Sequence, residues 1–151
     1  MIRPLSLVTL GILAVAATQE MPDRKIISTS RAPAAIGPYS QAVQVGNTLY
    51  LAGQIGLDPS TGEMVEGGIE AETRRVLENL GAILDAAGFT FGDVVQVQVF
   101  LSDLNDYGAM NRVYESYFAA DPPARAVVEV SKIPRGARVE IALIAVSEGK
   151  D

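Results

Sequence analysis

One arginine, Arg125, stands at the start of a run of β-branched residues within residues 122–130, shortly after two prolines. A guanidinium group at the start of a buried strand loses hydration unless it faces a cleft or meets an anion. Its planar N–H groups match a carboxylate through parallel hydrogen bonds. The sequence therefore leaves two interpretations of Arg125: it captures a small carboxylate, or it pairs with one of the chain's own acidic residues.

Cysteine and histidine are both absent from the 151 residues. Their absence excludes disulfides, thiol nucleophiles, thiolate metal sites and every catalytic triad that uses histidine. Any catalysis must come from carboxylates, Arg, Lys, Tyr, hydroxyl groups, backbone groups or bound water. We therefore expect a site without a metal ion and without a cofactor.

Four further residues have types and positions that suit a small-molecule site. Tyr39 ends the loop 32–41, where it either flanks a ligand or caps the core. Gly53 interrupts a row of bulky strand residues, which predicts a bulge or a close approach to the backbone. Asn111 lies on the apolar face of a predicted helix, where its amide braces a loop or reaches into a site. For Glu140, position alone predicts an ion pair with a nearby arginine.

The elements that position these residues follow from hydrophobic periodicity. An amphipathic helix is predicted over 68–87 and a second one over 103–119. A helix with one apolar stripe packs on a sheet, so the pattern predicts an α+β fold with both helices on one face of a single sheet. The strands of that sheet are predicted at 25–30, 42–45, 48–57, 93–101, after Arg125, and at 138–146, with the second and third joined as a hairpin. Val95 is predicted on the same face of its strand as Val97. Asp103 is expected to cap the second helix, whose apolar face includes Tyr107 and Tyr114.

Composition limits the class of partner. The formal net charge is -6 and the sequence pI is about 4.6, with no run of lysine or arginine. Such a chain lacks the basic face that tracks phosphates, so nucleic acid is not an expected partner. Hydrophobic residues make up 48% and charged residues 20%, which is typical of a folded domain.

Residues 1–17 resemble a secretory signal peptide, with Arg3 before an apolar stretch and the small-residue signal at 14–16. The apolar stretch is shorter than the roughly 20 residues of a membrane span, so we expect cleavage and no stable membrane association. This interpretation predicts an exported, periplasmic protein with its domain at 25–147. The alternative is translation from Met21, which would leave the protein cytoplasmic.

Several ordered motifs make the chain similar to the RidA/YjgF family of imine deaminases. The similarity extends from about residue 25 to residue 146. The segments that carry it are APAAIGPYSQ at 32–41, AGQI at 52–55, DLNDY at 103–107, PAR at 123–125, IP at 133–134 and VEI at 139–141. The resemblance implies a chorismate-mutase-like fold, a homotrimer and ligand clefts between subunits.

The resemblance also implies an activity, the hydrolysis of reactive 2-iminoacids such as 2-iminopropanoate and 2-iminobutanoate to 2-oxoacids and ammonia. It assigns carboxylate binding to Arg125 and orientation of water to Glu140. It implies that Tyr39, Gly53 and Asn111 line the cleft.

One departure from the family pattern is Val127, because many members have a cysteine two residues after the arginine. Val127 is expected to contact substrate and to alter the polarity of the pocket without abolishing the reaction, which needs no thiol. The runner-up function is a non-catalytic module that binds 2-oxoacids or other small carboxylates. A nuclease or translation inhibitor, and a holdase-like interaction protein, are further alternatives.

Overall fold

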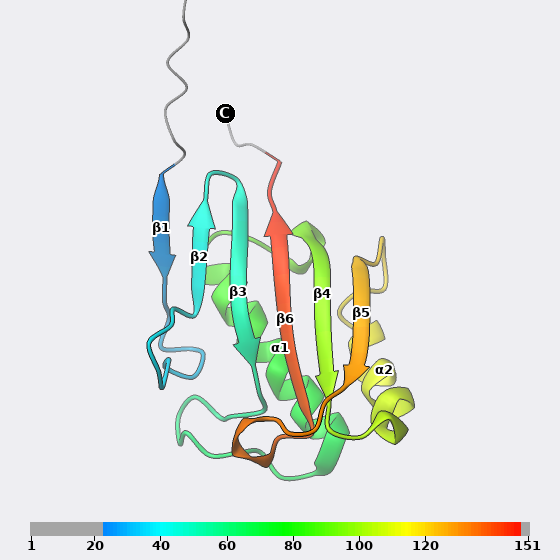
Figure 1. The fold of residues 1–151 in the computed structure, drawn as a ribbon. Coiled ribbons are helices and arrows are strands. Elements are labelled where there is room, and N and C mark those ends of the chain that lie inside the picture. The colour runs from blue at the N-terminus through cyan, green and yellow to red at the C-terminus, as the bar shows by residue number, and fades with distance from the viewer. Residues whose placement is uncertain (1–22, 149–151) are drawn as a thin grey trace, which may run out of the picture.

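The computed structural model describes residues 23–148, which form one six-stranded sheet with two α-helices packed on one face (Figure 1). The predicted signal peptide and Met21 lie outside the described residues. The elements in chain order are β1 (Arg24–Ile27), β2 (Ala42–Val45), β3 (Thr48–Gln54), α1 (Gly68–Ala86), η1 (Phe91–Asp93), β4 (Val94–Leu101), η2 (Leu104–Asp106), α2 (Tyr107–Glu115), β5 (Ala124–Glu129), η3 (Pro134–Gly136) and β6 (Val139–Val146).

The strands are arranged in the order β1-β2-β3-β6-β4-β5, so the last strand of the chain lies in the middle of the sheet (Figure 1). All neighbouring pairs are antiparallel except β4 and β5. A parallel pair needs a crossover connection, and α2 supplies it. β2 and β3 form the predicted hairpin, whose turn contains Gly46 at φ 59°.

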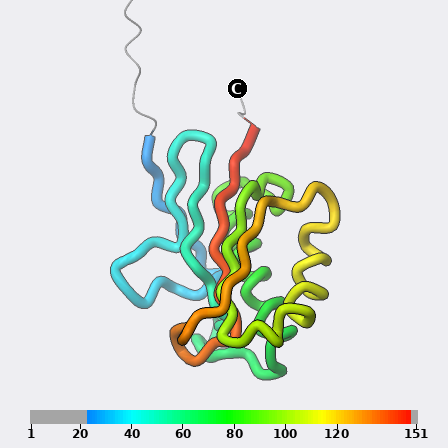
Figure 2. The backbone as a smooth tube through the Cα atoms, turned by 45° about the vertical axis from the view of Figure 1, so that its right-hand side comes forward, coloured from blue at the N-terminus to red at the C-terminus, as the bar shows by residue number. Residues whose placement is uncertain are grey.

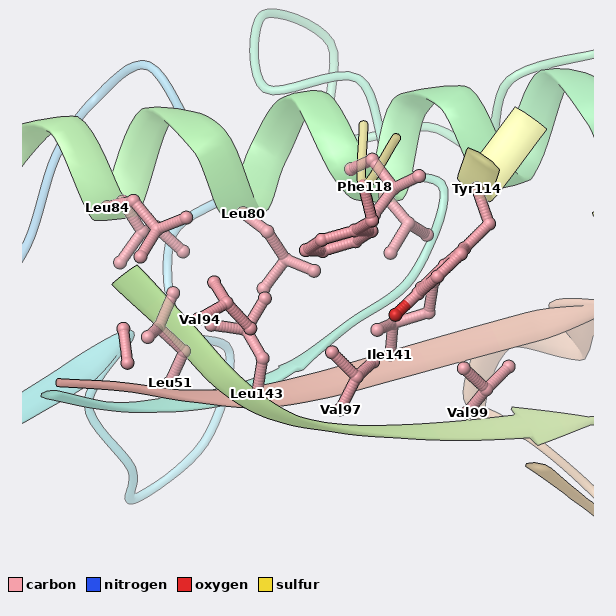
Figure 3. Close-up of a cluster of buried hydrophobic side chains, with 14 of the residues drawn as sticks. Leu51, Leu80, Leu84, Val94, Val97, Val99, Tyr114, Phe118, Ile141 and Leu143 are labelled. Atoms are coloured by element: carbon pink, nitrogen blue, oxygen red, sulfur yellow. The ribbon is translucent and has the colours of Figure 1, made fainter. Parts of the chain in front are cut away.

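The core lies between the sheet and the helices (Figure 3). Leu80 and Leu84 of α1 pack there with Ile141 of β6, and all three are almost fully buried. The 3.6-residue period of the apolar positions predicted α1 correctly to within one residue. The helix ends where Gly88 takes the left-handed conformation, with φ 77°.

Strand register assigns each side chain of the sheet to one of its two faces. Val97 is paired with Leu143 on one side and with Arg125 on the other, so these three side chains point toward the helices. Phe100 is paired with Glu140, and this row points to the opposite, open face, which faces the viewer in Figure 1. Arg125 and Glu140 therefore lie on opposite faces of the sheet.

The predicted bounds of three elements were wrong. The first strand ends at Ile27 and β3 ends at Gln54, because bends and turns follow both. The second helix begins at Tyr107, after the 3₁₀ turn η2, and ends at Glu115. Asp103 does cap this segment, since its side chain accepts a hydrogen bond from the Asn105 backbone N–H.

Val95 was also predicted on the wrong face of its strand. A register shift between Val94 and Gln96 turns Val95 outward, where it is 47% exposed, and places Val94 in the core. The two α-helices within residues 23–148 are also not of the length and hydropathy that a membrane span requires.

The loop between β1 and β2 extends away from the body of the molecule, on the side opposite α2 in Figure 2. It carries the APAAIGPYSQ motif. Ala32 is its one residue with a fully buried side chain before Gln41.

Candidate functional site

Arg125 lies at the start of β5 with its side chain against α2. Its NH1 group donates a hydrogen bond of 2.8 Å to Oδ1 of Asn111, and NH2 donates one of 3.3 Å to the hydroxyl of Tyr107. The guanidinium carbon lies 4.5 Å from the centre of the Tyr114 ring, which is a cation–π distance. We call these four residues the arginine half-site.

No carboxylate among residues 23–148 forms an ion pair with Arg125. Of the two interpretations of this arginine, the internal ion pair is therefore not found in that part of the chain. The hydrogen bond with Asn111 lowers the pKa of Tyr107, and the positive charge of Arg125 acts in the same direction. The guanidinium retains a positive charge that neutral groups orient but do not neutralise.

A shallow hollow of about 580 Å³ lies beside this guanidinium. It opens between α2 and the segment that leads into β5. Its lining consists of Asn111, Tyr114, Glu115, Phe118, Ala119, Pro122, Pro123 and Arg125. The hollow is large enough for a small carboxylate to reach the guanidinium.

The second predicted catalytic residue, Glu140, lies on the open face of β6 against the backbone of Gly53. A Cβ atom added at Gly53 would collide with Oε1 of Glu140 and would lie 2.9 Å from its Cδ. The register of β3 shifts between Leu51 and Gln54, so a bulge is present at the predicted position. Both sequence-based alternatives for Gly53 are therefore confirmed, and the group that approaches its backbone is Glu140.

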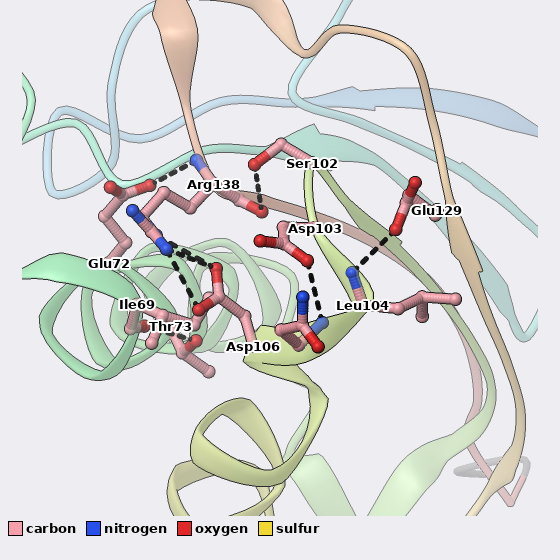
Figure 4. Close-up of polar contacts among 10 residues, drawn as sticks. Ile69, Glu72, Thr73, Ser102, Asp103, Leu104, Asp106, Glu129 and Arg138 are labelled. Atoms are coloured by element: carbon pink, nitrogen blue, oxygen red, sulfur yellow. Dashed lines mark hydrogen bonds and ion pairs between the residues drawn. The ribbon is translucent and has the colours of Figure 1, made fainter.

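The expected ion pair of Glu140 with a nearby arginine was wrong within residues 23–148. The nearest arginine in sequence, Arg138, instead donates 2.9 and 3.0 Å hydrogen bonds to Asp106 (Figure 4). Burial without a compensating charge raises the pKa of Glu140. A carboxyl group in this state is suited to accept a proton and to return it.

The start of β6 is fixed from α1. Glu72, a buried carboxylate, accepts a 2.8 Å hydrogen bond from the backbone N–H of Arg138 (Figure 4). Burial raises the pKa of Glu72, and the hydrogen bond from Arg138 opposes that effect. Because Arg138 is two residues before Glu140, this contact fixes the position of Glu140 along β6.

Glu140, Gly53 and Tyr39 line one cavity of about 330 Å³, and we call these three residues the glutamate half-site. The Tyr39 ring is 49% exposed, so of its two sequence-based roles it does not cap the core. Its hydroxyl accepts a hydrogen bond of 3.4 Å from the backbone N–H of Ile36. The remaining lining is largely apolar and consists of Pro33, Ala34, Ile36, Ala52, Gln54, Ile55, Leu57 and Pro134.

The two half-sites share no lining residue, and the sheet lies between them. Asn111 reaches into the arginine half-site and does not brace a loop, which was the other alternative. Val127 is on the same face of β5 as Arg125 but packs against the core and lines neither cavity. The predicted residues are therefore brought together as two groups, with Val127 outside both.

Sequence reasoning missed Tyr107 and Tyr114, which it assigned to the apolar face of the second helix. Both contact the guanidinium of Arg125. Their spacing of four and three residues from Asn111 placed all three on one helix face, which was a usable signal. No cluster of three or more acidic residues within 23–148 has a geometry suited to a metal ion.

Comparison with known proteins assigns the chain to a family. A family model described as Endoribonuclease L-PSP matches residues 29–147. A mouse protein named 2-iminobutanoate/2-iminopropanoate deaminase is 57% identical over 123 residues, which is 82% of this chain and 91% of the mouse protein. The human protein of the same name is 50% identical, over 82% of this chain and 90% of its own length.

Solved structures show the same fold. A putative endoribonuclease from Thermotoga maritima is 52% identical with a TM-score of 0.81, over 83% of this chain and 98% of that chain. E. coli TdcF with bound serine is 42% identical with a TM-score of 0.79, over 82% and 99% of the two chains. The identity, the coverage and the fold all agree with the motifs, and the chain belongs to the RidA/YjgF family.

Proposed function

We propose that the chain hydrolyses reactive 2-iminoacids, such as 2-iminopropanoate and 2-iminobutanoate, to 2-oxoacids and ammonia. The observation that carries the proposal is the Arg125 guanidinium, which neutral groups hold beside an open hollow. The names of relatives that are 50–57% identical support the same chemistry.

Arg125 binds the carboxylate of the substrate. Two unit charges 4 Å apart attract by about 4 kcal/mol at an effective dielectric of 20, before desolvation is subtracted. This energy is enough to orient a three- or four-carbon acid. Asn111 and Tyr107 fix the plane of the guanidinium, so that its free N–H groups present a constant geometry to the ligand.

Glu140 positions water and transfers protons. A protonated imine is already electrophilic, so water adds to its carbon while Glu140 accepts a proton from that water. The proton then returns from Glu140 to the nitrogen of the resulting carbinolamine. The C–N bond breaks as the hydroxyl group becomes the carbonyl of the 2-oxoacid, and the departing ammonia takes up the hydroxyl proton and leaves as ammonium. The raised pKa of Glu140 favours the return step, and such acid–base help is commonly worth about 10² to 10⁴ in rate.

A cleft that contains both groups requires two copies of the chain, because Arg125 and Glu140 point to opposite faces of one sheet. The proposed assembly is a homotrimer in which the arginine half-site of one subunit meets the glutamate half-site of the next. The open face supports association. Among the residues of β3, β4, β5 and β6 that point to this open face, Glu140 is the one charged residue. Tyr50 and Val128 on the same face are each nearly half exposed.

The test is deamination of iminoacid generated in the assay by an amino-acid oxidase or a threonine dehydratase. Arg125→Ala is expected to lose at least tenfold in ammonia release, because a charge-assisted hydrogen bond to a carboxylate is worth about 1.5–3 kcal/mol. Arg112→Ala is the matched control, since Arg112 lies on α2 and pairs with exposed Glu70 at 2.7 Å. Equal activity of wild type and Arg125→Ala would exclude the proposal.

The runner-up function is a module that binds small carboxylates without turnover. The bound serine of E. coli TdcF makes ligand binding in this family a specific alternative. Glu140→Gln separates the two functions. Under the enzymatic proposal this variant binds 2-oxobutanoate with wild-type affinity and releases ammonia more slowly than wild type. A pure binding module keeps the affinity, and neither its wild type nor the variant releases ammonia faster than the uncatalysed reaction.

The family model's description also names an endoribonuclease. Binding of RNA would require neutralisation of phosphates, and the chain has a net charge of -6. RNA cleavage that disappears steeply with added salt would favour this function over the deaminase.

Export through a signal peptide at residues 1–17 is a separate proposal that rests on the sequence alone. The mass of the mature N-terminus in the native host tests it. A protein that starts at Met21 would instead support a cytoplasmic location.

A further inference from the structure

One wall of the glutamate half-site is a loop with few connections to the rest of the molecule. The segment 32–40 contributes Pro33, Ala34, Ile36 and Tyr39 to the 330 Å³ cavity. It forms no helix or strand and extends away from the body of the protein (Figure 2). Its internal hydrogen bonds are local, from Tyr39 N–H to Gly37 and from Ile36 N–H to Tyr39.

The hydrogen bonds that connect segment 32–40 to other described residues all come from the side chain of Gln41. Its Nε2 donates to the carbonyl oxygens of Pro33 at 2.7 Å and Ala32 at 3.3 Å. The same amide donates to the Thr29 carbonyl at 3.1 Å and accepts from the Thr29 N–H at 2.6 Å. Gln41 is only 4% exposed, so water does not compete for these contacts.

The backbone of Gln41 is hydrogen-bonded to the sheet. It precedes β2, and its carbonyl accepts a 3.0 Å hydrogen bond from the N–H of Ala52, next to Gly53. Gln41 therefore connects segment 32–40 to β3, the strand whose Gly53 lies against Glu140.

The opposite wall of the cavity, which includes Ile55 and Leu57, is hydrogen-bonded both to α1 and within its own backbone. Asn79 of α1, 1% exposed, donates to the carbonyls of Leu57 at 2.9 Å and Ile55 at 3.4 Å. That wall also has backbone bonds of its own, from Val65 N–H to Gly56 and from Leu57 N–H to Ile55. Loss of the Asn79 side chain would leave these backbone bonds in place. Loss of the Gln41 side chain leaves segment 32–40 without a hydrogen bond to the rest of the described residues, 23–148.

We infer that Gln41 is a positioning residue, which holds segment 32–40 in place so that the cavity is formed before a ligand arrives. The inference rests on the proposed function for the identity of the ligand. Preorganisation of a wall lowers the entropy that binding must remove, so its loss weakens binding without removing any group that contacts the ligand. No group of the arginine half-site is involved.

The test compares Gln41→Met with Gln44→Met, which replaces the same residue type three positions along. Gln44 donates one 3.0 Å hydrogen bond to the Gly46 carbonyl and lines none of the site. The readouts are affinity for 2-oxobutanoate by calorimetry and backbone ¹⁵N order parameters of residues 34–40. Measurements are made below the melting transition of every variant, with Asn79→Leu as a second comparison.

Gln41→Met is expected to lower the order parameters of 34–40 below about 0.6, the flexible range, and to weaken 2-oxobutanoate binding about tenfold. The order parameters of β3 and β6 stay unchanged. Gln44→Met and Asn79→Leu keep segment 34–40 rigid.

Unchanged order parameters in Gln41→Met would overturn the inference, and so would a mobile loop with unchanged affinity. Order lost equally in β3 and β6 would also overturn it, because Gln41 would then support the whole fold. A wild type that binds no 2-oxobutanoate contradicts the proposed function instead. In that case the order parameters alone decide whether Gln41 holds the wall.

Discussion

Glu140 is a carboxylic acid that lies against the backbone of Gly53 with no cationic partner among residues 23–148. Its charged form loses hydration there, and nothing nearby repays the loss. Such an arrangement costs stability and is characteristic of groups that act on a ligand. By contrast, Arg138 and Asp106 form a two-bond ion pair, as structural charges do.

This cost predicts how stability depends on pH. Burial raises the pKa of Glu140 in the folded state, so its contribution to stability is full below the unfolded-state pKa and is lost as pH rises through the folded-state pKa. Glu140→Gln removes this loss. We expect the variant to match wild type in urea unfolding near pH 4 and to exceed it near pH 7.

Exposed Glu66→Gln is the control for the pH experiment, since it removes the same charge without a burial cost. It should shift stability similarly at both pH values. A Glu140→Gln variant that is less stable than wild type at pH 7 would mean that the carboxylate has a favourable partner in the assembled protein.

At the residue scale, the sequence was informative where a residue type conflicts with its position. Arg125 at the start of a β-branched run and Gly53 in a bulky row were both identified this way. Gln41 was not, because a glutamine beside a loop is an ordinary residue in an ordinary place. Its burial follows from how β1, β2 and the loop fold together, which no local pattern encodes.

At the element scale, the bulge in β3 and the strand β6 form a matched pair. Gly53, which lies in the bulge, leaves room for Glu140 where this side chain lies against the neighbouring strand. Gly53→Ala should displace Glu140 and lower the free energy of unfolding by about 1–3 kcal/mol. In a Glu140→Ala background the same change should cost much less, and chemical denaturation of the four proteins measures the coupling. Equal costs in both backgrounds would show that the glycine serves another purpose.

The turn η3, between β5 and β6, contains backbone strain. Arg135 has φ 61°, a left-handed conformation that glycine adopts without cost, and its side chain makes only exposed contacts of 3.3 and 3.4 Å. Arg135→Gly should therefore raise the free energy of unfolding by roughly 1 kcal/mol. Gly136→Ala, at φ 71°, should lower it by a similar amount. Thermal unfolding of both variants tests the prediction, and a destabilised Arg135→Gly would contradict it.

Elements in which the apolar pattern repeats many times could be predicted, and elements in which the pattern is interrupted could not. The 19 residues of α1 repeat the apolar pattern often enough to fix its ends. The shift between Val94 and Gln96 inserts one residue and reverses the alternation, which left Val95 on the wrong face. The segment before α2 begins as a 3₁₀ turn, and its polar residues suit either kind of helix.

At the scale of the whole molecule, the sheet decides what one chain can do. Its register places Arg125 among the helices and Glu140 on the open face, so a small substrate cannot touch both in one subunit. The family resemblance implied clefts between subunits, but the residue pattern itself did not place Arg125 and Glu140 on opposite faces, because strand order is a long-range property. The proposed trimer resolves it, and light scattering should give a mass three times that of one chain.

Mixed trimers test the composite cleft directly. Arg125→Ala and Glu140→Gln are each expected to have strongly reduced activity alone, since every cleft then lacks one group. Coexpression in equal amounts, with a different tag on each chain, yields trimers that contain both variants. A cleft is intact when its arginine comes from a Glu140→Gln subunit and its glutamate from an Arg125→Ala subunit, which random mixing gives at about one quarter of clefts. Ammonia release should recover to about one quarter of wild type, and recovery should vanish if the two tagged forms are purified separately and not mixed. If coexpressed trimers with both tags stay inactive, the two half-sites do not meet across subunits, and Arg125 and Glu140 do not act on one substrate.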